Sequence, residues 1–239
     1  MLRESKGNMF EWVTHTWNPI KGKCSHDCEY CYMKIFPQKP IRLDDGELRD
    51  NLGRDNIIFV GSSTDMFAED VPNEWIDKVL AKCKLFDNTY LFQTKNPKRF
   101  SDFDGNYPAK SIFGTTIETN RENNLAKAPS RAERVQYIKD RGKSMVTIEP
   151  IMDFDLEPFV AILKEVQPDW VNIGADSKNH NLPEPTREKV DALIIELQKF
   201  TEIKKKHNLN RLVLLTEKQA GGYGLPPTAK AVGIRPTTL

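Results

Sequence analysis

Three cysteines close together near the start of the chain are the residues best suited to chemistry. Cys24, Cys28 and Cys31 follow a C-x3-C-x2-C spacing, and no fourth cysteine lies nearby. An iron-sulfur cubane has four irons, so three thiolate ligands from the protein leave one iron open to a small chelating molecule. The spacing therefore predicts a [4Fe-4S] cluster with one open coordination site.

Two other interpretations of these cysteines stay open. His26 could complete a structural zinc site, although closed zinc sites usually consist of two ligand pairs separated by a longer loop. The cysteines could also form a redox or regulatory cluster, and the protein would then be a non-catalytic binding module. The fourth cysteine, Cys83, stands alone in a helical segment and is expected to be an ordinary core residue.

The elements that must position the cysteine loop alternate between apolar strands and amphipathic helices. A strand at 10–17 leads directly into the cysteines. Further strands are predicted at 56–60, 89–93, 111–118, 143–149 and 170–173, with a seventh at 211–215. Helices are predicted at 72–86, 130–141, 156–166 and about 186–207, and Ser130 and Glu133 have capping-box spacing.

This alternation predicts an α/β fold with a parallel sheet. Six or seven βα units in 239 residues favour a barrel or partial barrel over an open doubly wound sheet. We expect one domain over residues 1–219. The tail at 220–239 would either cover the barrel mouth as a lid or remain a mobile terminus.

Composition limits the classes of partner. The 35 Lys and Arg residues nearly balance the 34 Asp and Glu residues, so no global field attracts nucleic acid or a membrane surface. No apolar run approaches the roughly 18 residues of a membrane span. Clustered cysteines do not fit a disulfide framework. We expect a cytoplasmic protein without a membrane partner.

The cysteine motif, with the aromatic Tyr30 before its last cysteine and a strand in front, resembles the signature of the radical S-adenosylmethionine superfamily. The elements TKNP, TTIETN and IGADS are similar to a phage-associated family of unresolved activity, distantly like spore photoproduct lyase. The resemblance implies a partial (β/α)6 barrel in which Cys24, Cys28 and Cys31 bind the cluster. It implies reductive cleavage of S-adenosylmethionine to a 5′-deoxyadenosyl radical, which abstracts hydrogen from a substrate.

The same resemblance implies partners and further cofactor contacts. An external electron donor such as flavodoxin or ferredoxin would reduce the cluster, and the substrate would be a nucleotide, nucleoside or nucleic acid. Tyr30 corresponds to the aromatic residue beside the adenine. Two turns at strand ends correspond to those that meet the methionine amino group and the adenine: Gly61, Ser62, Ser63 and Asp65, and then Gly174, Ala175 and Asp176. The first turn has one glycine where the pattern often has two, and either turn could be an ordinary tight turn.

Other candidates follow from their positions in the predicted strands. Thr116 and Glu118 face the same side because strand side chains alternate, and Glu118 could hold ribose hydroxyls or the methionine ammonium. Arg121 could pair with the methionine carboxylate or form a solvated loop salt bridge. Glu149 ends an apolar strand, which is costly for a carboxylate unless it is paired or functional.

Two lysines are the candidates for a catalytic role. Lys95 follows the third strand and Lys218 the predicted seventh, so both could bind an anionic substrate at the barrel mouth. The run from Lys204 to His207 is expected to be the solvated end of the long helix.

Overall fold

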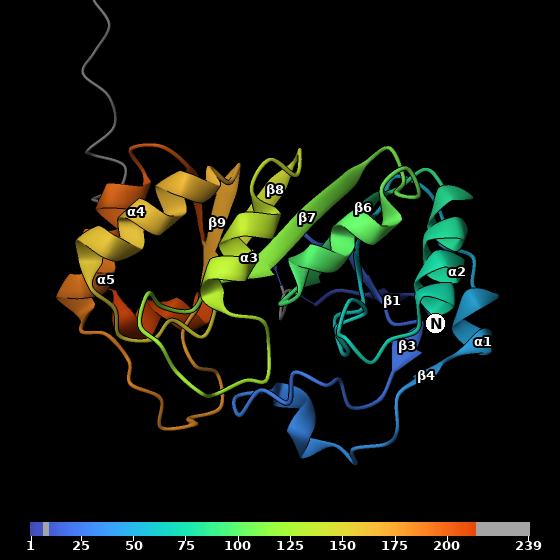
Figure 1. Cartoon of the computed structure of the whole chain (residues 1–239), viewed down its shortest axis with the longest axis horizontal. Coiled ribbons are helices and arrows are strands. Elements are labelled where there is room, and N and C mark those ends of the chain that lie inside the picture. Colours follow the sequence, from blue (N-terminus) through green and yellow to red (C-terminus); the bar gives the residue numbers. More distant parts are fainter. Residues whose placement is uncertain (7–9, 214–239) are drawn as a thin grey trace, which may run out of the picture.

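The computed structural model describes residues 1–6 and 10–213 (Figure 1). In these residues the chain forms a large sheet in the order β1-β2-β5-β6-β7-β8-β9-β10. All neighbours from β2 to β10 pair in parallel, and β1 joins the edge antiparallel to β2. The strands are β1 (Arg3–Glu4), β2 (His15–Trp17), β5 (Ile57–Val60), β6 (Thr89–Thr94), β7 (Ser111–Thr116), β8 (Ser144–Ile148), β9 (Trp170–Ile173) and β10 (Glu202–Lys205).

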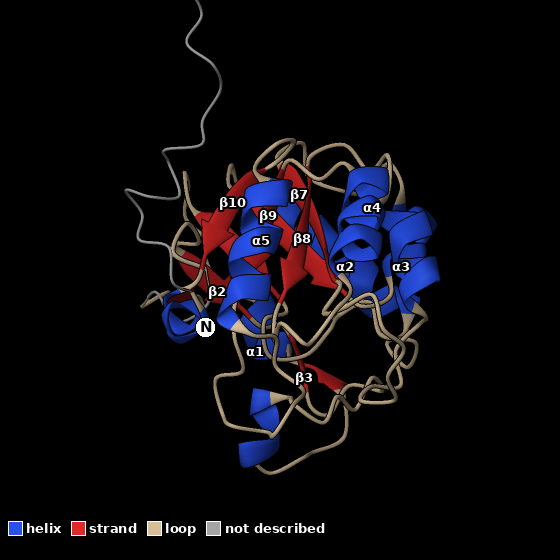
Figure 2. Cartoon of the chain, turned by 90° about the vertical axis from the view of Figure 1, so that its left-hand side faces the viewer, coloured by secondary structure: helices blue, strands red, loops and turns tan. Residues whose placement is uncertain are grey.

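The remaining elements connect these strands. A small antiparallel pair, β3 (Ile20–Lys21) and β4 (Arg42–Leu43), flanks the cysteine segment. Helices pack around the strands (Figure 2). They are α1 (Asp45–Leu48), α2 (Asn73–Lys84), α3 (Arg131–Ile138), α4 (Leu156–Val166) and α5 (Arg187–Leu197), with 3-10 helices η1 (Tyr32–Ile35), η2 (Pro97–Phe103) and η3 (His207–Leu212).

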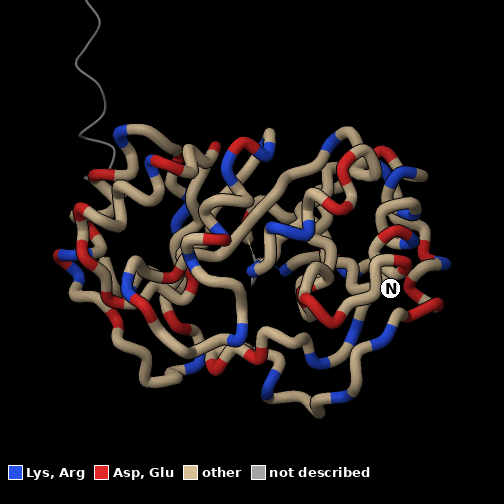
Figure 3. Tube along the Cα trace, viewed as in Figure 1, with Lys and Arg blue, Asp and Glu red and all other residues tan. Residues whose placement is uncertain are grey.

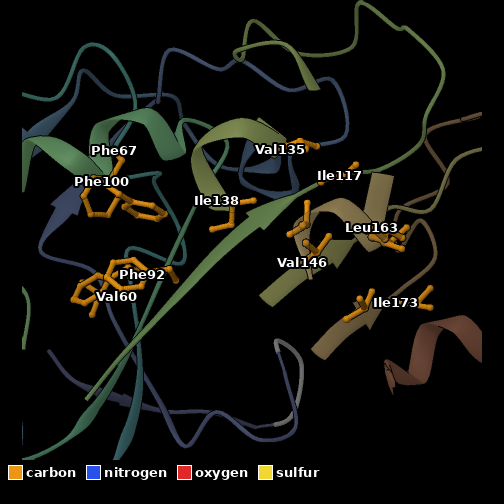
Figure 4. Packing of buried hydrophobic residues seen from close by; sticks show 14 of the residues in the cluster. Val60, Phe67, Phe92, Phe100, Ile117, Val135, Ile138, Val146, Leu163 and Ile173 are labelled. Atoms are coloured by element: carbon orange, nitrogen blue, oxygen red, sulfur yellow. The ribbon is translucent and has the colours of Figure 1, made fainter. Parts of the chain in front are cut away.

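The main core lies between the outer face of the sheet and helices α2–α5. Alternate strand residues such as Phe92, Val146 and Ile173 point to this side, where they pack with Ile138 and Leu163 of the helices (Figure 4). Cys83 is fully buried in the same core, as its apolar context predicts. Ser130 and Glu133 form the predicted capping box at the start of α3.

The other face of the sheet curves around a second cluster, which includes the N-terminal segment. Phe10 stacks on Phe59, with ring centroids 5.9 Å apart, and Trp12 packs edge-on against Trp170 of β9 at 5.3 Å. The indole Nε1 of Trp12 donates to Asn172 Oδ1 at 3.2 Å. The strand predicted at 10–17 therefore begins only at His15, and the aromatic side chains of residues 10–14 pack in the interior of the partial barrel instead.

The last predicted helix and the predicted seventh strand were placed at the wrong residues. Helix α5 ends at Leu197, and the seventh parallel strand is Glu202–Lys205 rather than 211–215. The open edge of β9 offers unpaired backbone groups, and pairing with β10 satisfies them. Residues 211 and 212 belong to η3, while residues 214 and 215 lie outside the described residues.

The predicted fold class, a partial barrel of parallel βα units with an added seventh strand, is confirmed. The domain limits of 1–219 and 220–239 stay a prediction, because the tail lies outside the described residues. Within the described part of the chain, every helix is too short or too polar to cross a membrane.

Candidate active site

A cavity of about 530 Å³ opens at the carboxyl ends of the parallel strands. Parallel α/β folds build their sites at this end, because the loops after the strands converge there. Cys24, Cys28 and Cys31 all line the cavity. Other predicted site residues also line it: Tyr30, Gly61, Ser62, Ser63, Asp65, Lys95, Thr116, Glu149, Ala175 and Asp176.

The cysteine loop crosses the cavity mouth between β3 and η1 and is held on the far side by the loop after β7. The backbone N–H of Glu29 donates to Leu125 O at 2.8 Å, and that of Lys127 donates to His26 O at 2.7 Å. Burial, together with the nearby charge of Asp65, raises the pKa of the Cys24 thiol to about 11. Burial likewise raises the pKa of Cys28. The positive charge of Lys95 acts on Cys28 in the opposite direction and partly offsets the effect of burial.

Asp65 ties this loop to the ends of β5 and β6. Its Oδ2 accepts from His26 Nε2, Thr94 Oγ1 and the Lys95 backbone N–H, each at 2.9 Å, and its Oδ1 accepts from Phe67 N at 2.9 Å. Burial opposes ionisation, but His26 and these donors outweigh it and lower the pKa of Asp65. Asp65 thus faces the cavity with its acceptors already engaged, and His26 points at a carboxylate.

The turn after β5 is held by Asn18, which follows β2. Asn18 Oδ1 accepts from the Ser63 N–H at 2.9 Å and from Ser62 Oγ at 3.2 Å. Gly61 has a φ of +77°, and a Cβ there would lie 3.0 Å from Thr64 O, so the turn needs glycine. The first two parallel strands thus hold this turn beside the cysteine loop.

A buried ion cluster surrounds Glu118, which follows β7. Its Oε1 lies 2.9 Å from Lys95 Nζ and accepts a short hydrogen bond from Tyr30 Oη, and its Oε2 lies 2.9 Å from Arg134. Burial would raise the pKa of Glu118, but Lys95 and then Arg134 lower it to about 2. The Lys95 ammonium also lies 5.4 Å from the Tyr30 ring centroid. Glu118 therefore lies behind Lys95 and Tyr30, which both reach the cavity.

Glu149, which follows the neighbouring strand β8, forms a second ion cluster. Its Oε2 lies 2.7 Å from Lys206 Nζ, and its Oε1 accepts from Asn208 Nδ2 at 3.1 Å. A Cβ at Gly174 would lie 2.9 Å from the Glu149 carboxylate, so Gly174 makes room for this side chain. The prediction that Lys206 belongs to the solvated end of a helix was wrong. Lys206 follows strand β10 and lines the cavity.

Asp176 and Arg121 are both engaged in local contacts. Asp176 accepts from His180 Nδ1 at 2.6 Å and from the Lys178 N–H at 3.1 Å, beside the cavity. Arg121 pairs with Asp153 and Asp155 and does not line the cavity. Lys218 lies outside the described residues.

Several cavity residues were missed by the sequence analysis. Gln93 Nε2 donates to Thr116 Oγ1 at 3.2 Å, whereas Gln93 Oε1 and Thr147 Oγ1 are buried without a partner in the described structure. Gln93 precedes Lys95 by two positions, and Thr147 precedes Glu149 by two. The period-two alternation of strands was therefore a signal that could have found them.

The donor set fits a cluster held by three thiols. Within the described residues, no three thiol, imidazole or carboxylate groups converge as a single ion would require. A cluster instead distributes its thiolates over separate irons. The buried unpartnered oxygens of Gln93 and Thr147 also favour a polar molecule inside the cavity.

Comparisons with known proteins agree with this architecture. One structure is a variant of spore photoproduct lyase with bound AdoMet and dinucleoside spore photoproduct; it aligns with a TM-score of 0.65 at 13% identity, over 85% of this chain and 78% of that one. Another variant with the dinucleoside aligns with a TM-score of 0.65 at 14% identity and the same coverage. The resemblance to radical S-adenosylmethionine enzymes is thus confirmed for the fold.

Sequence comparison identifies the family. No curated protein matches the chain significantly. A family model described as "Protein of unknown function (DUF5131)" matches residues 7–189. The chain therefore belongs to the DUF5131 family.

Proposed function

We propose that this protein is a radical enzyme in which Cys24, Cys28 and Cys31 hold a [4Fe-4S] cluster that reductively cleaves S-adenosylmethionine. The observation that carries the proposal is the position of the three thiols. They follow the first parallel strand and line one cavity with polar strand-end residues, in a fold similar to that of spore photoproduct lyase. An external donor such as flavodoxin or ferredoxin would reduce the cluster.

The cofactor carries the difficult step, and the chain binds and orients the reactants. When bound, the cluster supplies one electron to the sulfonium, which gives methionine and a 5′-deoxyadenosyl radical that can take a hydrogen atom from a substrate. Phe10 and Phe59 line the cavity with apolar rings. These rings leave less room for water beside the cofactor, which would limit side reactions of a radical.

Lys95 is the best-placed cation for the methionine carboxylate. It lines the cavity, and its charge acts on the Cys28 thiol, so its ammonium lies near the cysteine loop. Glu118 holds Lys95 from behind at 2.9 Å, and Arg134 supplies a second positive charge to that cluster. Arg121 is occupied by two aspartates instead. We therefore assign the carboxylate to Lys95.

The remaining contacts of S-adenosylmethionine would come from strand ends. The unpartnered Gln93 Oε1 is an acceptor for the methionine ammonium. The Thr147 hydroxyl can accept from that ammonium, or donate to the methionine carboxylate or to a ribose oxygen. Ala175 and Asp176 lie at the end of β9, where the adenine would approach the backbone. The cavity volume of about 530 Å³ lies in the range of roughly 300–1,000 Å³ for small-molecule sites.

A nucleotide, nucleoside or nucleic acid is the substrate class to test first. Similar structures of spore photoproduct lyase contain a dinucleoside spore photoproduct. The substrate would enter the same cavity beside the sulfonium.

The test is anaerobic reconstitution followed by measurement of 5′-deoxyadenosine with a strong reductant. The wild-type chain should form 5′-deoxyadenosine, and the separate Cys24→Ala, Cys28→Ala and Cys31→Ala variants should not. Cys83→Ala is the matched control, because Cys83 lies in the core away from the cavity, and it should retain the activity. Stoichiometric zinc with no S-adenosylmethionine cleavage would contradict the proposal.

A further inference from the structure

A second hollow adjoins the candidate active site. It measures about 660 Å³ and lies between the N-terminal strand β1 and the segment that follows the cysteine motif. Four residues, Tyr32, Met33, Ser62 and Ser63, line both this hollow and the active-site cavity. We call the second hollow the basic groove. A ligand lying in it would pass directly beside the cysteine loop.

The basic groove concentrates positive charge in an otherwise balanced protein. Arg3, Lys6, Lys39 and Arg42 line it and are exposed, and in the described structure none of them has an ion-pair partner. Residues 30–43 contain three cations and no carboxylate, and Figure 3 shows these blue segments along the lower loop. Among the described lining residues, Glu4 is the one carboxylate without an ion-pair partner, since Glu47 binds Lys21. The groove is therefore suited to a polyanion.

Exposed aromatic side chains accompany these cations. Tyr32 and Phe36 line the groove with exposed fractions of 40% and 52%. Tyr32 Oη donates to Ser62 O at 2.8 Å, which fixes its ring at the border between groove and cavity. Gln38 Nε2 donates to Met33 O at 2.7 Å and to Phe36 O at 2.9 Å, which braces the loop. The Tyr32 ring is thus fixed by its own hydrogen bond, and the backbone that carries Phe36 is braced by Gln38.

We infer that the basic groove binds a single-stranded polynucleotide, whose phosphates contact Arg3, Lys39 and Arg42 and whose bases stack on Tyr32 and Phe36. Cations that follow a backbone and aromatic rings that stack bases are the two components of single-strand binding sites. An acidic protein would complement the charge but would not need exposed rings beside the cavity. The inference rests on the proposed function, since it makes the nucleotide that enters the cavity part of a strand.

The test is binding of a fluorescein-labelled single-stranded oligonucleotide of about 15 nucleotides, followed by fluorescence anisotropy at several salt concentrations. The reconstituted full-length protein is used without S-adenosylmethionine, so the result does not depend on turnover. The double variant Lys39→Ala/Arg42→Ala should bind at least about tenfold more weakly. The negative slope of log K against log salt should become shallower by about 1.4, because two phosphate contacts are lost. Phe36→Ala should weaken binding without changing that slope.

The matched control removes the same charge elsewhere. Arg54 and Lys78 are exposed and do not line the groove, so Arg54→Ala/Lys78→Ala should change the affinity less than about twofold. Equal losses in the two double variants, or no oligonucleotide binding by the wild type, would overturn the inference. Binding of flavodoxin that is lost in Lys39→Ala/Arg42→Ala, without oligonucleotide binding, would also overturn it. Oligonucleotide binding without 5′-deoxyadenosine formation would instead leave the groove intact and contradict the proposed function.

Discussion

The imidazole Nε2 of His26, a residue inside the three-cysteine motif, lies 2.9 Å from Oδ2 of Asp65. His26 is 3% exposed, and the same carboxylate oxygen accepts from Thr94 and from the Lys95 N–H. One carboxylate thus joins the cysteine loop to the ends of two parallel strands. In the cluster interpretation, His26 is a positioning residue and not a ligand.

His26→Ala should therefore weaken cluster retention. Loss of a contact that orients metal ligands typically costs about tenfold or more in metal affinity, and Asp65 would also lose a buried donor. Iron per chain during titration with a chelator measures the effect. His26→Gln, whose amide nitrogen can donate to Asp65, should restore most of the retention. Equal iron retention in the Ala variant and the wild type would exclude this role.

The cation assignments predict different results for two residues. Lys95→Ala should lower the affinity for S-adenosylmethionine about tenfold or more, because a charge-assisted hydrogen bond is worth roughly 1.5–3 kcal/mol. Lys95→Arg should recover part of it. Arg121→Ala should change that affinity less than about twofold and should leave the unfolding midpoint nearly unchanged, since its ion pairs are exposed to solvent. Isothermal titration calorimetry measures the affinity for S-adenosylmethionine in each variant. A large loss in Arg121→Ala with little loss in Lys95→Ala would instead assign the methionine carboxylate to Arg121.

The Glu118 cluster predicts a pH dependence of stability. The pKa of Glu118 is lowered from 4.5 to about 2 by Lys95 and Arg134 against the opposing effect of burial. The ionised carboxylate thus stabilises the fold above pH 4.5, and this contribution is lost as the pH falls towards 2. Its size is on the order of 3 kcal/mol, at about 1.4 kcal/mol for each pH unit. Tyr30 also faces the carboxylate, as a neutral donor.

Glu118→Gln should accordingly lower the free energy of unfolding at pH 7 by about that amount. The difference from the wild type should shrink between pH 4.5 and 2, as measured by urea unfolding at each pH. Glu122→Gln is the control: its carboxylate pairs with Arg131 but is 83% exposed, so we expect a change below about 0.5 kcal/mol. A Glu118 effect that is constant with pH would contradict the ionic explanation.

Gly174 provides a test of the packing around Glu149. A Cβ there would lie 2.9 Å from the Glu149 carboxylate and 3.0 Å from Asn208 Oδ1. Gly174→Ala should destabilise the protein by roughly 1–3 kcal/mol through overpacking. In a Glu149→Ala background the same substitution should cost less, because the closer of the two contacts is removed. Additive losses in thermal unfolding would argue against steric contact as the cause.

Much of the fold was predictable because its signals are local. The buried strands β5, β6 and β9 are short apolar runs, and α4 occupies the predicted residues 156–166. The prediction for residues 198–213 was wrong because the lysine-rich strand β10 carries little apolar pattern and forms only through pairing with β9. The strand assignment of residues 10–14 was wrong because aromatic residues suit a strand as well as a barrel core.

The site was predictable where it follows strand ends, and not where it depends on distant contacts. Glu149 and Lys95 were found because each directly follows a strand. Their partners could not be found in this way: His26 and Asp65 are 39 positions apart, and Lys206 and Glu149 are 57 apart. Only the packing of the sheet brings such pairs together.

The most direct test of the central claim is electron paramagnetic resonance of the reconstituted, reduced protein before and after addition of S-adenosylmethionine. A [4Fe-4S] cluster with one open iron should give a low-temperature signal, and its g-values should change when S-adenosylmethionine chelates that iron. The Cys83→Ala variant should behave like the wild type, and Cys28→Ala should give no such signal. A signal that S-adenosylmethionine does not alter, or a protein that binds only zinc, would contradict the account.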